Sequence, residues 1–119
     1  MPSHRETGLA IGGRKEDLAL RYLQRRGLHL VVRNYRCRQG EIDLVMRDND
    51  CLTFVEVRYR KGESFGSPAE SVTRTKQRRI ILAARHYLQR YPSALDCRFD
   101  VLALTGKEQI EWLKNAFME

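Results

Sequence analysis

Three β-type segments follow one another between residues 28 and 60, and no other feature constrains the fold of this chain as much. They span residues 28–35, 41–47 and 52–60 and are rich in the aliphatic and aromatic residues that favour strands. A turn at residues 36–40 separates the first two, and Asp48-Asn49-Asp50 predicts a tight hairpin turn before the third. The sequence therefore predicts a sheet whose second and third strands form a hairpin.

Helical patterns lie on both sides of these segments. Residues 13–26 place apolar side chains at three- and four-residue intervals, namely Leu18, Ala19, Tyr22 and Leu23. A second helix is predicted over residues 72–90 and ends before Pro92. Residues 98–104 predict a further strand. The segment that contains Ile110 and Trp112 predicts a short strand followed by a terminal helical turn.

The order α-β-β-β-α-β-β predicts an α/β fold in which helices flank a mixed β-sheet. With 119 residues, the chain has the length of one domain. We expect residues 1–11 to form a flexible N-terminus and residues 12–119 to form the domain. Residues 61–70 contain Gly and Pro and predict a loop.

Several classes of protein are excluded by what the sequence lacks. There is no run of about 18 apolar residues typical of a membrane helix, and the first residues lack a signal-peptide pattern. Cys37, Cys51 and Cys97 are odd in number and widely spaced, which disfavours a disulfide framework or a closed zinc site and predicts reduced thiols in the cytoplasm. The His residues lack metal-binding spacing, and nucleotide-binding loops and GxSxG motifs are absent.

Positive charge is concentrated in two segments of the chain. The formal net charge is +7, and Arg supplies 17 of the 22 basic residues. Residues 14–38 carry eight basic and two acidic side chains, residues 58–90 carry nine and two, and the rest of the chain is net acidic. Arg is preferred where a planar fork binds phosphate. We therefore expect a phosphate-contacting surface along the two helices, although each helix alone is also compatible with an ordinary solvated face.

Acidic residues inside apolar segments are the most informative charges. Glu56 shares a strand face with Leu52 and Phe54, and Asp43 interrupts an aliphatic run. If Asn49 and Asp50 are the two loop residues of the hairpin, Asp43 lies opposite Glu56 with the Cβ atoms about 4.5–5.5 Å apart. Two carboxylates this close repel each other unless one is protonated or a cation lies between them. Mg²⁺ or Mn²⁺ fits such a pair, because these cations prefer oxygen ligands.

A third acid, Glu16, lies on the first predicted helix. It precedes Ala19 by three residues and Leu23 by seven, so it belongs to the apolar side of the helix and can reach the sheet. Each acid also has a simpler explanation. Glu16 can interact with the helix dipole, Glu56 can form an ion pair with Arg58, and Asp43 can accept hydrogen bonds near a turn. A shared site accounts for all three together.

The spacing D-x₁₂-E-x-[K/R], with a helical Glu upstream, resembles the layout of the restriction-endonuclease-like (PD-(D/E)XK) nucleases. The sequence around this motif is similar to the YraN family of small bacterial proteins, which is itself similar to archaeal Holliday-junction resolvases. The similarity covers roughly residues 12–117 and is carried by four motifs: Gly40-Glu41-Ile42-Asp43-Leu44, Phe54-Val55-Glu56-Val57-Arg58-Tyr59-Arg60, Ser71-Val72-Thr73-Arg74-Thr75-Lys76-Gln77 and Cys97-Arg98-Phe99-Asp100-Val101. The resemblance implies a restriction-endonuclease-like mixed sheet flanked by helices.

The resemblance also implies roles for individual residues. Asp43 and Glu56 would be metal ligands, with the backbone carbonyl of Val57 as a third, and Glu16 would steady the metal or its water. Arg58 stands where the motif has Lys. It can position water or stabilise charge on the phosphate, but it cannot lose a proton near neutral pH. On the second helix, Lys76 is a candidate for the missing Lys, although a solvent-facing Lys is as compatible with its position, and Gln77 is a further candidate.

These features predict a metal-dependent, structure-specific DNA endonuclease that acts on branched DNA, with a homodimer as a further expectation. The expected nucleic-acid-binding residues are Arg60, Arg74, Lys76, Gln77 and Arg78. Recognition by shape is expected, because no helix carries Asn, Gln and Arg at groove-reading spacing. Two alternatives stay open. One is a nucleic-acid-binding protein that keeps the fold without cleaving, and the other is a protein-interaction module with a basic docking surface. Steep salt dependence of DNA binding separates the first from the second.

Overall fold

The computed structural model describes residues 8–60, 72–105 and 109–118 of the chain. Within them the elements are α1 (Gly8–Arg25), β1 (His29–Cys37), β2 (Gly40–Asp48), β3 (Cys51–Arg60), α2 (Arg74–Arg90), β4 (Asp96–Thr105) and β5 (Ile110–Phe117). The predicted order of elements is therefore confirmed. The helix α1 begins at Gly8 and so includes the last part of the segment assigned above to the N-terminus. The predicted loop over residues 61–70 lies outside the described residues.

The five strands form one sheet in the order β1-β2-β3-β4-β5. Neighbours are antiparallel except β3 and β4, which are parallel because α2 lies between them in the chain. The predicted hairpin turn is confirmed, since β2 ends at Asp48, β3 begins at Cys51 and Asn49 has a φ of 54°. Neither described helix has the length and apolar character needed to cross a lipid bilayer.

The predicted terminal helical turn is wrong, because β5 continues as a strand to Phe117. Phe117 pairs with Phe99 of β4 in the ladder, and the two rings stack with their centroids 5.1 Å apart. Burial of this aromatic pair stabilises the extended end of the chain and outweighs the local pattern that predicts a helical turn.

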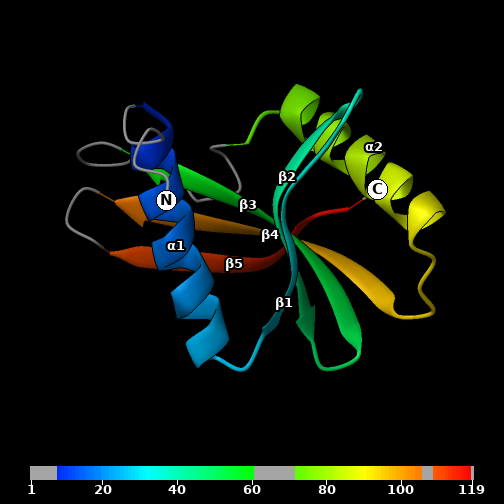
Figure 1. The fold of residues 1–119 in the computed structure, drawn as a ribbon, viewed down its shortest axis with the longest axis horizontal. Helices are drawn as coiled ribbons and strands as arrows, with labels where there is room; N and C mark the ends of the chain where they lie inside the picture. Colours follow the sequence, from blue (N-terminus) through cyan, green and yellow to red (C-terminus); the bar gives the residue numbers. More distant parts are fainter. Residues whose placement is uncertain (1–7, 61–71, 106–108, 119) are drawn as a thin grey trace.

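The two helices cover opposite faces of the sheet (Figure 1). On the α1 face, the buried apolar residues are Ala19, Leu23, Leu28, Leu44, Met46, Val55, Leu102 and Leu104. On the α2 face, a larger cluster is rich in aromatic residues and contains Tyr35, Ile42, Val45, Leu52, Phe54, Val72, Ile80, Ala83, Ala84, Tyr87, Phe99, Val101 and Phe117. Burial of apolar surface on both faces holds the three layers together.

The strands β2 and β3 separate at Asp43, and this separation creates the most unusual part of the fold. Their ladder ends at the pair Leu44–Val55, whereas β2 stays paired with β1 as far as Gly40 and β3 stays paired with β4 as far as Arg60. In Figure 1 the β1–β2 hairpin accordingly turns toward α2 while β3 runs away with β4 and β5. Asp43 therefore lies where the sheet divides.

Two local features fix the course of the β1–β2 hairpin. Asn34 lies opposite Asp43 between the pairs Arg33–Leu44 and Tyr35–Ile42, and its φ of 54° is in the left-handed region that Asn tolerates. Near the hairpin tip, Gly40 packs closely on α2. A Cβ atom on Gly40 would lie 3.1 Å from the carbonyl oxygen of Arg79, so a larger residue would push the hairpin away from the helix.

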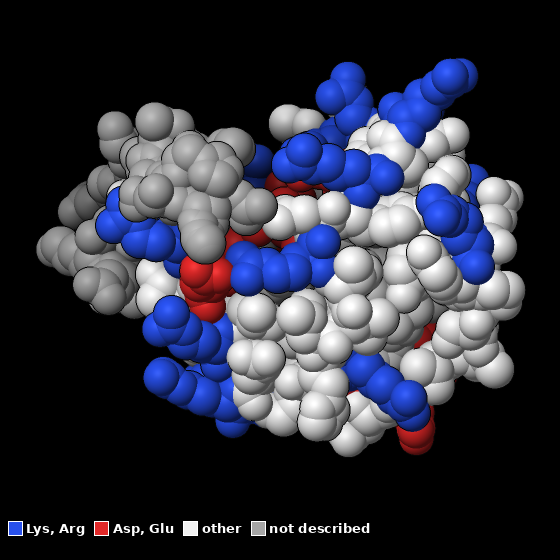
Figure 2. Space-filling view, viewed as in Figure 1, with Lys and Arg blue, Asp and Glu red and all other residues white. Residues whose placement is uncertain are grey.

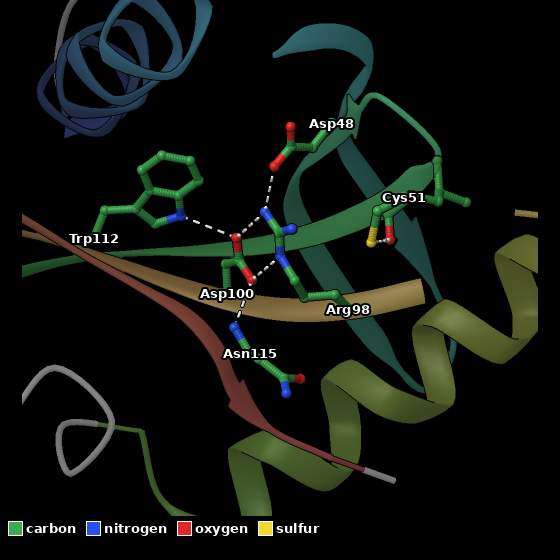
Figure 3. Close-up of polar contacts among 7 residues, drawn as sticks. Asp48, Cys51, Arg98, Asp100, Trp112 and Asn115 are labelled. Carbon is green, nitrogen blue, oxygen red and sulfur yellow. Dashed lines mark hydrogen bonds and ion pairs between the residues drawn. The ribbon is translucent and has the colours of Figure 1, made fainter. Parts of the chain in front are cut away.

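A second acid in an apolar strand, Asp100 of β4, is fully buried and fully hydrogen-bonded (Figure 3). Its carboxylate accepts hydrogen bonds from Arg98 Nε and Nη2 at 2.9 and 3.0 Å, from Trp112 Nε1 at 2.9 Å and from the Asn115 backbone at 2.9 Å. Arg98 also donates to Asp48 at 2.9 Å. Burial alone would lower the pKa of Arg98, but the hydrogen bonds to Asp100 and Asp48 raise it. This network joins β4 to β5 and to the end of β2.

We predict that Asp100→Asn lowers the free energy of unfolding by about 3 kcal/mol, because it removes the fully buried counter-charge of Arg98 and leaves Asp48 as the acidic partner. Urea denaturation measures this loss. The control is Asp96→Asn, the same change at an exposed position of the same strand, which should leave the stability nearly unchanged. Equal effects of the two substitutions would contradict a structural role for the Asp100 network.

Candidate active site

Asp43 and Glu56 form a carboxylate pair at the point where β2 and β3 separate. The five recorded β2–β3 pairs, from Asp48–Cys51 to Leu44–Val55, follow the predicted register, and Asp43 and Glu56 come next along the two strands. Oδ2 of Asp43 accepts a hydrogen bond from the Val57 backbone N–H at 2.8 Å. The Glu56 side chain is only 4% exposed, and Asp43 is partly buried. The fold thus places two acids side by side with little solvent around them.

The two carboxyl groups strongly affect each other's protonation. Burial and the nearby charge of Glu56 raise the pKa of Asp43 from 3.8 to about 7, although the hydrogen bond from Val57 opposes the shift. Burial also raises the pKa of Glu56, against the opposing effects of Lys76, Arg58 and a hydrogen bond with Asp43. The pair therefore holds a proton near neutral pH that an isolated Asp would have lost.

Two cations approach the same oxygen of Glu56. Lys76 Nζ lies 3.6 Å from Glu56 Oε2, and Arg58 Nη1 lies 3.7 Å from it. Lys76 stands in the first turn of α2, where the hydroxyl of Thr73 caps the helix by accepting a hydrogen bond from the Lys76 backbone N–H at 3.1 Å. Arg58 comes from β3 itself, and its Nε is buried with no hydrogen-bond partner. The structure thus brings both predicted basic candidates to the acid pair.

Glu16 lies near this pair but is held by a residue that the sequence did not indicate. Arg33 of β1 contacts Glu16 Oε1 at 3.6 Å and Asp17 Oδ1 at 2.8 Å. The charge of Glu16 still raises the pKa of Asp43, so the two groups interact across the α1 face. Arg33 had no detectable sequence signal, because its partners are on another element and basic residues are common throughout the segment.

Three of the remaining predicted site residues, Arg74, Gln77 and Arg78, line one hollow on α2. The side chain of Gln77 donates to the Val72 carbonyl at 3.0 Å and so closes the start of α2. Arg74 and Arg78 are exposed, and the hollow, of about 750 Å³, is also lined by Arg85 and the apolar Ile81 and Leu82. Figure 2 shows acidic atoms on this side of the molecule lying between basic side chains. The side chain of Arg60 lies outside the described residues.

The donor set fits a small hard cation such as Mg²⁺. Among the residues that the structure describes, no three Asp, Glu, His or Cys side chains gather closely enough to hold a metal on their own. Mg²⁺ does not require such a cage, because it is commonly bound by one or two carboxylates and keeps several waters. Val57 donates its N–H toward Asp43. The N–H and C=O of one strand residue point toward the same neighbour, so the Val57 carbonyl also faces the space beside Asp43.

Asp43 and Asp100 give the same sequence signal but have different surroundings. Both interrupt apolar strands, yet four hydrogen bonds reach the Asp100 carboxylate, whereas Asp43 receives one backbone hydrogen bond and faces a second acid. A satisfied buried carboxylate stabilises the fold, and an acid pair with a raised pKa is typical of a functional site. This contrast identifies Asp43 and Glu56, rather than Asp100, as the candidate site.

Comparison with known proteins places the chain in one family. A model described as "Uncharacterised protein family UPF0102" matches residues 15–104. A UPF0102 protein of Cupriavidus pinatubonensis is 54% identical over 118 residues, which cover 98% of this chain and 92% of that protein. A UPF0102 protein of Cupriavidus taiwanensis is 57% identical over 91% of this chain and 82% of its own length. A UPF0102 protein of Herminiimonas arsenicoxydans is 56% identical over 89% of this chain and 85% of its own length.

We predict that Asp43→Asn stabilises the metal-free protein above neutral pH. A carboxyl whose pKa is raised in the fold contributes stability that is fully present below about pH 3.8 and is lost as the pH rises through about 7. The amide oxygen of Asn still accepts the Val57 hydrogen bond, and the repulsion from Glu56 disappears. At about pH 8 the variant should therefore be more stable by about 1–3 kcal/mol, with little gain at about pH 4.

Urea unfolding with EDTA at both pH values measures this difference. Glu41→Gln, an exposed substitution on the same strand, is the control and should show a much smaller dependence on pH. A less stable Asp43→Asn variant at the higher pH would contradict the repulsion between the two carboxylates.

Proposed function

The chain belongs to the uncharacterised protein family UPF0102, and we propose that it is a metal-dependent endonuclease that hydrolyses phosphodiester bonds in structured DNA. Membership in the family agrees with the resemblance to YraN, whereas the relation to resolvases is part of the proposal. The observation that carries the proposal is the buried Asp43–Glu56 pair, with its raised pKa values and two adjacent cations. Such a pair needs a positive partner when both groups ionise.

Asp43 and Glu56 would hold a divalent cation together with the backbone carbonyl of Val57. A cation bound there lowers the pKa of a coordinated water and neutralises charge on the phosphate. Glu16 contributes negative charge beside Asp43, which suits a role in orienting water. Arg33 limits this role, because it holds Glu16 on the α1 side.

Hydrolysis replaces one phosphorus–oxygen bond with another. A water oxygen bonds to phosphorus, the bond to the leaving sugar oxygen breaks, water loses a proton, and the leaving oxygen gains one. Arg58 remains charged throughout, so it acts by stabilising the negative charge that develops on the phosphate oxygens. It extends from the central strand β3 and approaches Glu56 Oε2 to 3.7 Å, so its charge lies beside the carboxylate pair where the phosphate would bind.

The second helix supplies the contact with DNA. The 17 residues of α2 include Arg74, Lys76, Arg78, Arg79, Arg85 and Arg90 and no acidic residue. Contacts from such a helix to phosphates carry no sequence information, which supports recognition of DNA by shape. We include Arg60 in this surface by its place at the end of β3. Branched DNA as the substrate, a homodimer and a cytoplasmic location are parts of the same proposal.

A second candidate function is a nucleic-acid-binding protein that keeps the fold without cleaving. The observation that favours it is Arg58, because the corresponding Lys in related nucleases can assist deprotonation of water and Arg cannot. The two functions share the basic surface and differ only in what happens at the carboxylate pair.

Cleavage of labelled DNA separates these functions. We predict that the protein cuts at least one of a four-way junction, a flap, a duplex and a single strand with Mg²⁺ or Mn²⁺, and that EDTA, Asp43→Asn and Glu56→Gln each abolish cutting. Asp96→Asn, far along the sheet, should cut at the rate of the unaltered protein. Binding without cutting under either metal would favour the second function.

Arg58→Met should lower the cleavage rate by about 100-fold, as is typical when one charge-stabilising donor is lost. The pH profile of the remaining activity should not change, because Arg58 does not titrate in the accessible range. Single-turnover rates at several pH values test this. A pH profile that changes with Arg58→Met would show that Arg58 acts on the proton transfer instead.

A further inference from the structure

We propose that Lys76 is a mobile counter-ion, which neutralises the Asp43–Glu56 pair until a divalent cation binds there and then transfers its charge to the DNA phosphate. The binding of metal and of DNA would thus be coupled through one side chain. This inference rests on the proposed function, because it assumes that the carboxylate pair holds the metal. It goes further by assigning Lys76 a role that depends on what the pair has bound.

The contact between Lys76 and Glu56 is loose for a buried carboxylate. Their closest atoms are 3.6 Å apart, whereas Arg98 and Asp100 approach to 2.9 Å in the structural network. The Lys76 side chain is 38% exposed and reaches inward to a Glu56 side chain that is 4% exposed. An ammonium on a partly exposed side chain, held at this distance, costs little to release, because water can solvate it again.

The backbone of Lys76 is held in place, whereas its side chain is long and partly exposed. Thr73 caps the helix through the Lys76 N–H, and α2 packs on β1 and β2. Beyond this fixed point, a flexible four-carbon chain carries a compact charge with three rotatable donors. Lys76 can therefore move its charge without any movement of the fold.

Arg58 contacts the same oxygen but is not suited to this role. Its contact with Glu56 is as loose and its side chain as exposed as those of Lys76, at 3.7 Å and 37%, but its Nε is buried and it extends from β3 beside the pair. Of the two cations, Lys76 is also the one that belongs to the basic helix α2. It thus connects the carboxylate pair to the surface on which we place the DNA.

Electrostatics links the two binding events. A divalent cation bound by Asp43 and Glu56 would take the place of Lys76 beside Glu56 and would repel its ammonium group. An incoming phosphate then offers a new partner, so bound metal favours DNA. By linkage, bound DNA favours metal to the same extent. Without Lys76 only Arg58 remains to compete with the metal for Glu56, and the part of the coupling that Lys76 carries disappears.

The first test is the affinity for Mg²⁺ without DNA, measured by isothermal titration calorimetry. Lys76→Met should bind Mg²⁺ about three- to tenfold more tightly than the unaltered protein, because a positive charge near the site has been removed. Arg78→Met is the matched control, since it removes one charge from the same helix without a contact to Glu56, and it should bind Mg²⁺ as the unaltered protein does. Lys76→Gln serves as a second variant that keeps the position polar.

The second test is the affinity for a fluorescent duplex, measured by anisotropy with EDTA or with Ca²⁺ as a metal that supports little cleavage. For the unaltered protein, Ca²⁺ should raise the affinity for DNA several-fold beyond any effect of ionic strength. Both Lys76 variants should lose most of this increase. Arg78→Met should bind DNA more weakly under both conditions and keep the same relative increase.

The possible failures are distinguishable. If the unaltered protein does not bind Mg²⁺, the proposed function fails and this inference fails with it. If Mg²⁺ binds but the Lys76 variants bind it with unchanged affinity, only the counter-ion role is overturned. If they bind Mg²⁺ more tightly but retain the full effect of Ca²⁺ on DNA binding, the transfer of charge to phosphate is overturned.

Discussion

The hydrogen bond from the Val57 backbone to Asp43 is the contact on which the arrangement of the site depends. Where β2 leaves β3, the N–H groups of β3 that point toward β2 lose their strand partner, whereas those toward β4 keep theirs. A buried N–H without an acceptor costs about 1–3 kcal/mol. The Asp43 carboxylate replaces the missing strand. Because Val57 follows Glu56 in β3, this hydrogen bond also keeps the Asp43 carboxylate beside Glu56. One contact thus compensates for the division of the sheet and holds the two acids together.

Asp43 and Asp100 show how one sequence pattern can serve two purposes. Asp100 has as many hydrogen bonds as its two oxygens readily accept, and its neighbours Trp112 and Asn115 come from β5. Asp43 instead has a competing carboxylate and cations at some distance. The first arrangement stabilises one conformation. The second leaves negative charge incompletely compensated, which is the condition that a binding site for a cation requires.

The parts of the site that could be predicted from the sequence are those fixed by residues close together in the chain. The Asn49 turn determines the β2–β3 register, and this register brings Asp43 and Glu56 together. The partners of Glu16 and Glu56 on other elements were not predictable in this way. Arg33 and Lys76 reach these acids only after α1 and α2 have packed on opposite faces, and several neighbouring basic residues would have matched the sequence pattern equally well. The end of β5 was also missed, because Phe99 rather than a local signal keeps Phe117 extended.

The strand order also has a consequence for how the molecule forms. The strands β1, β2 and β3 are consecutive antiparallel neighbours, whereas the parallel pairing of β3 with β4 requires the chain to pass through α2 first. Local contacts form earlier during folding than distant ones. We therefore expect the two acids to meet before α2 brings Lys76 to them. At that stage Arg58, which is on β3 itself, is already beside Glu56, and the second positive charge arrives only when α2 packs on the sheet.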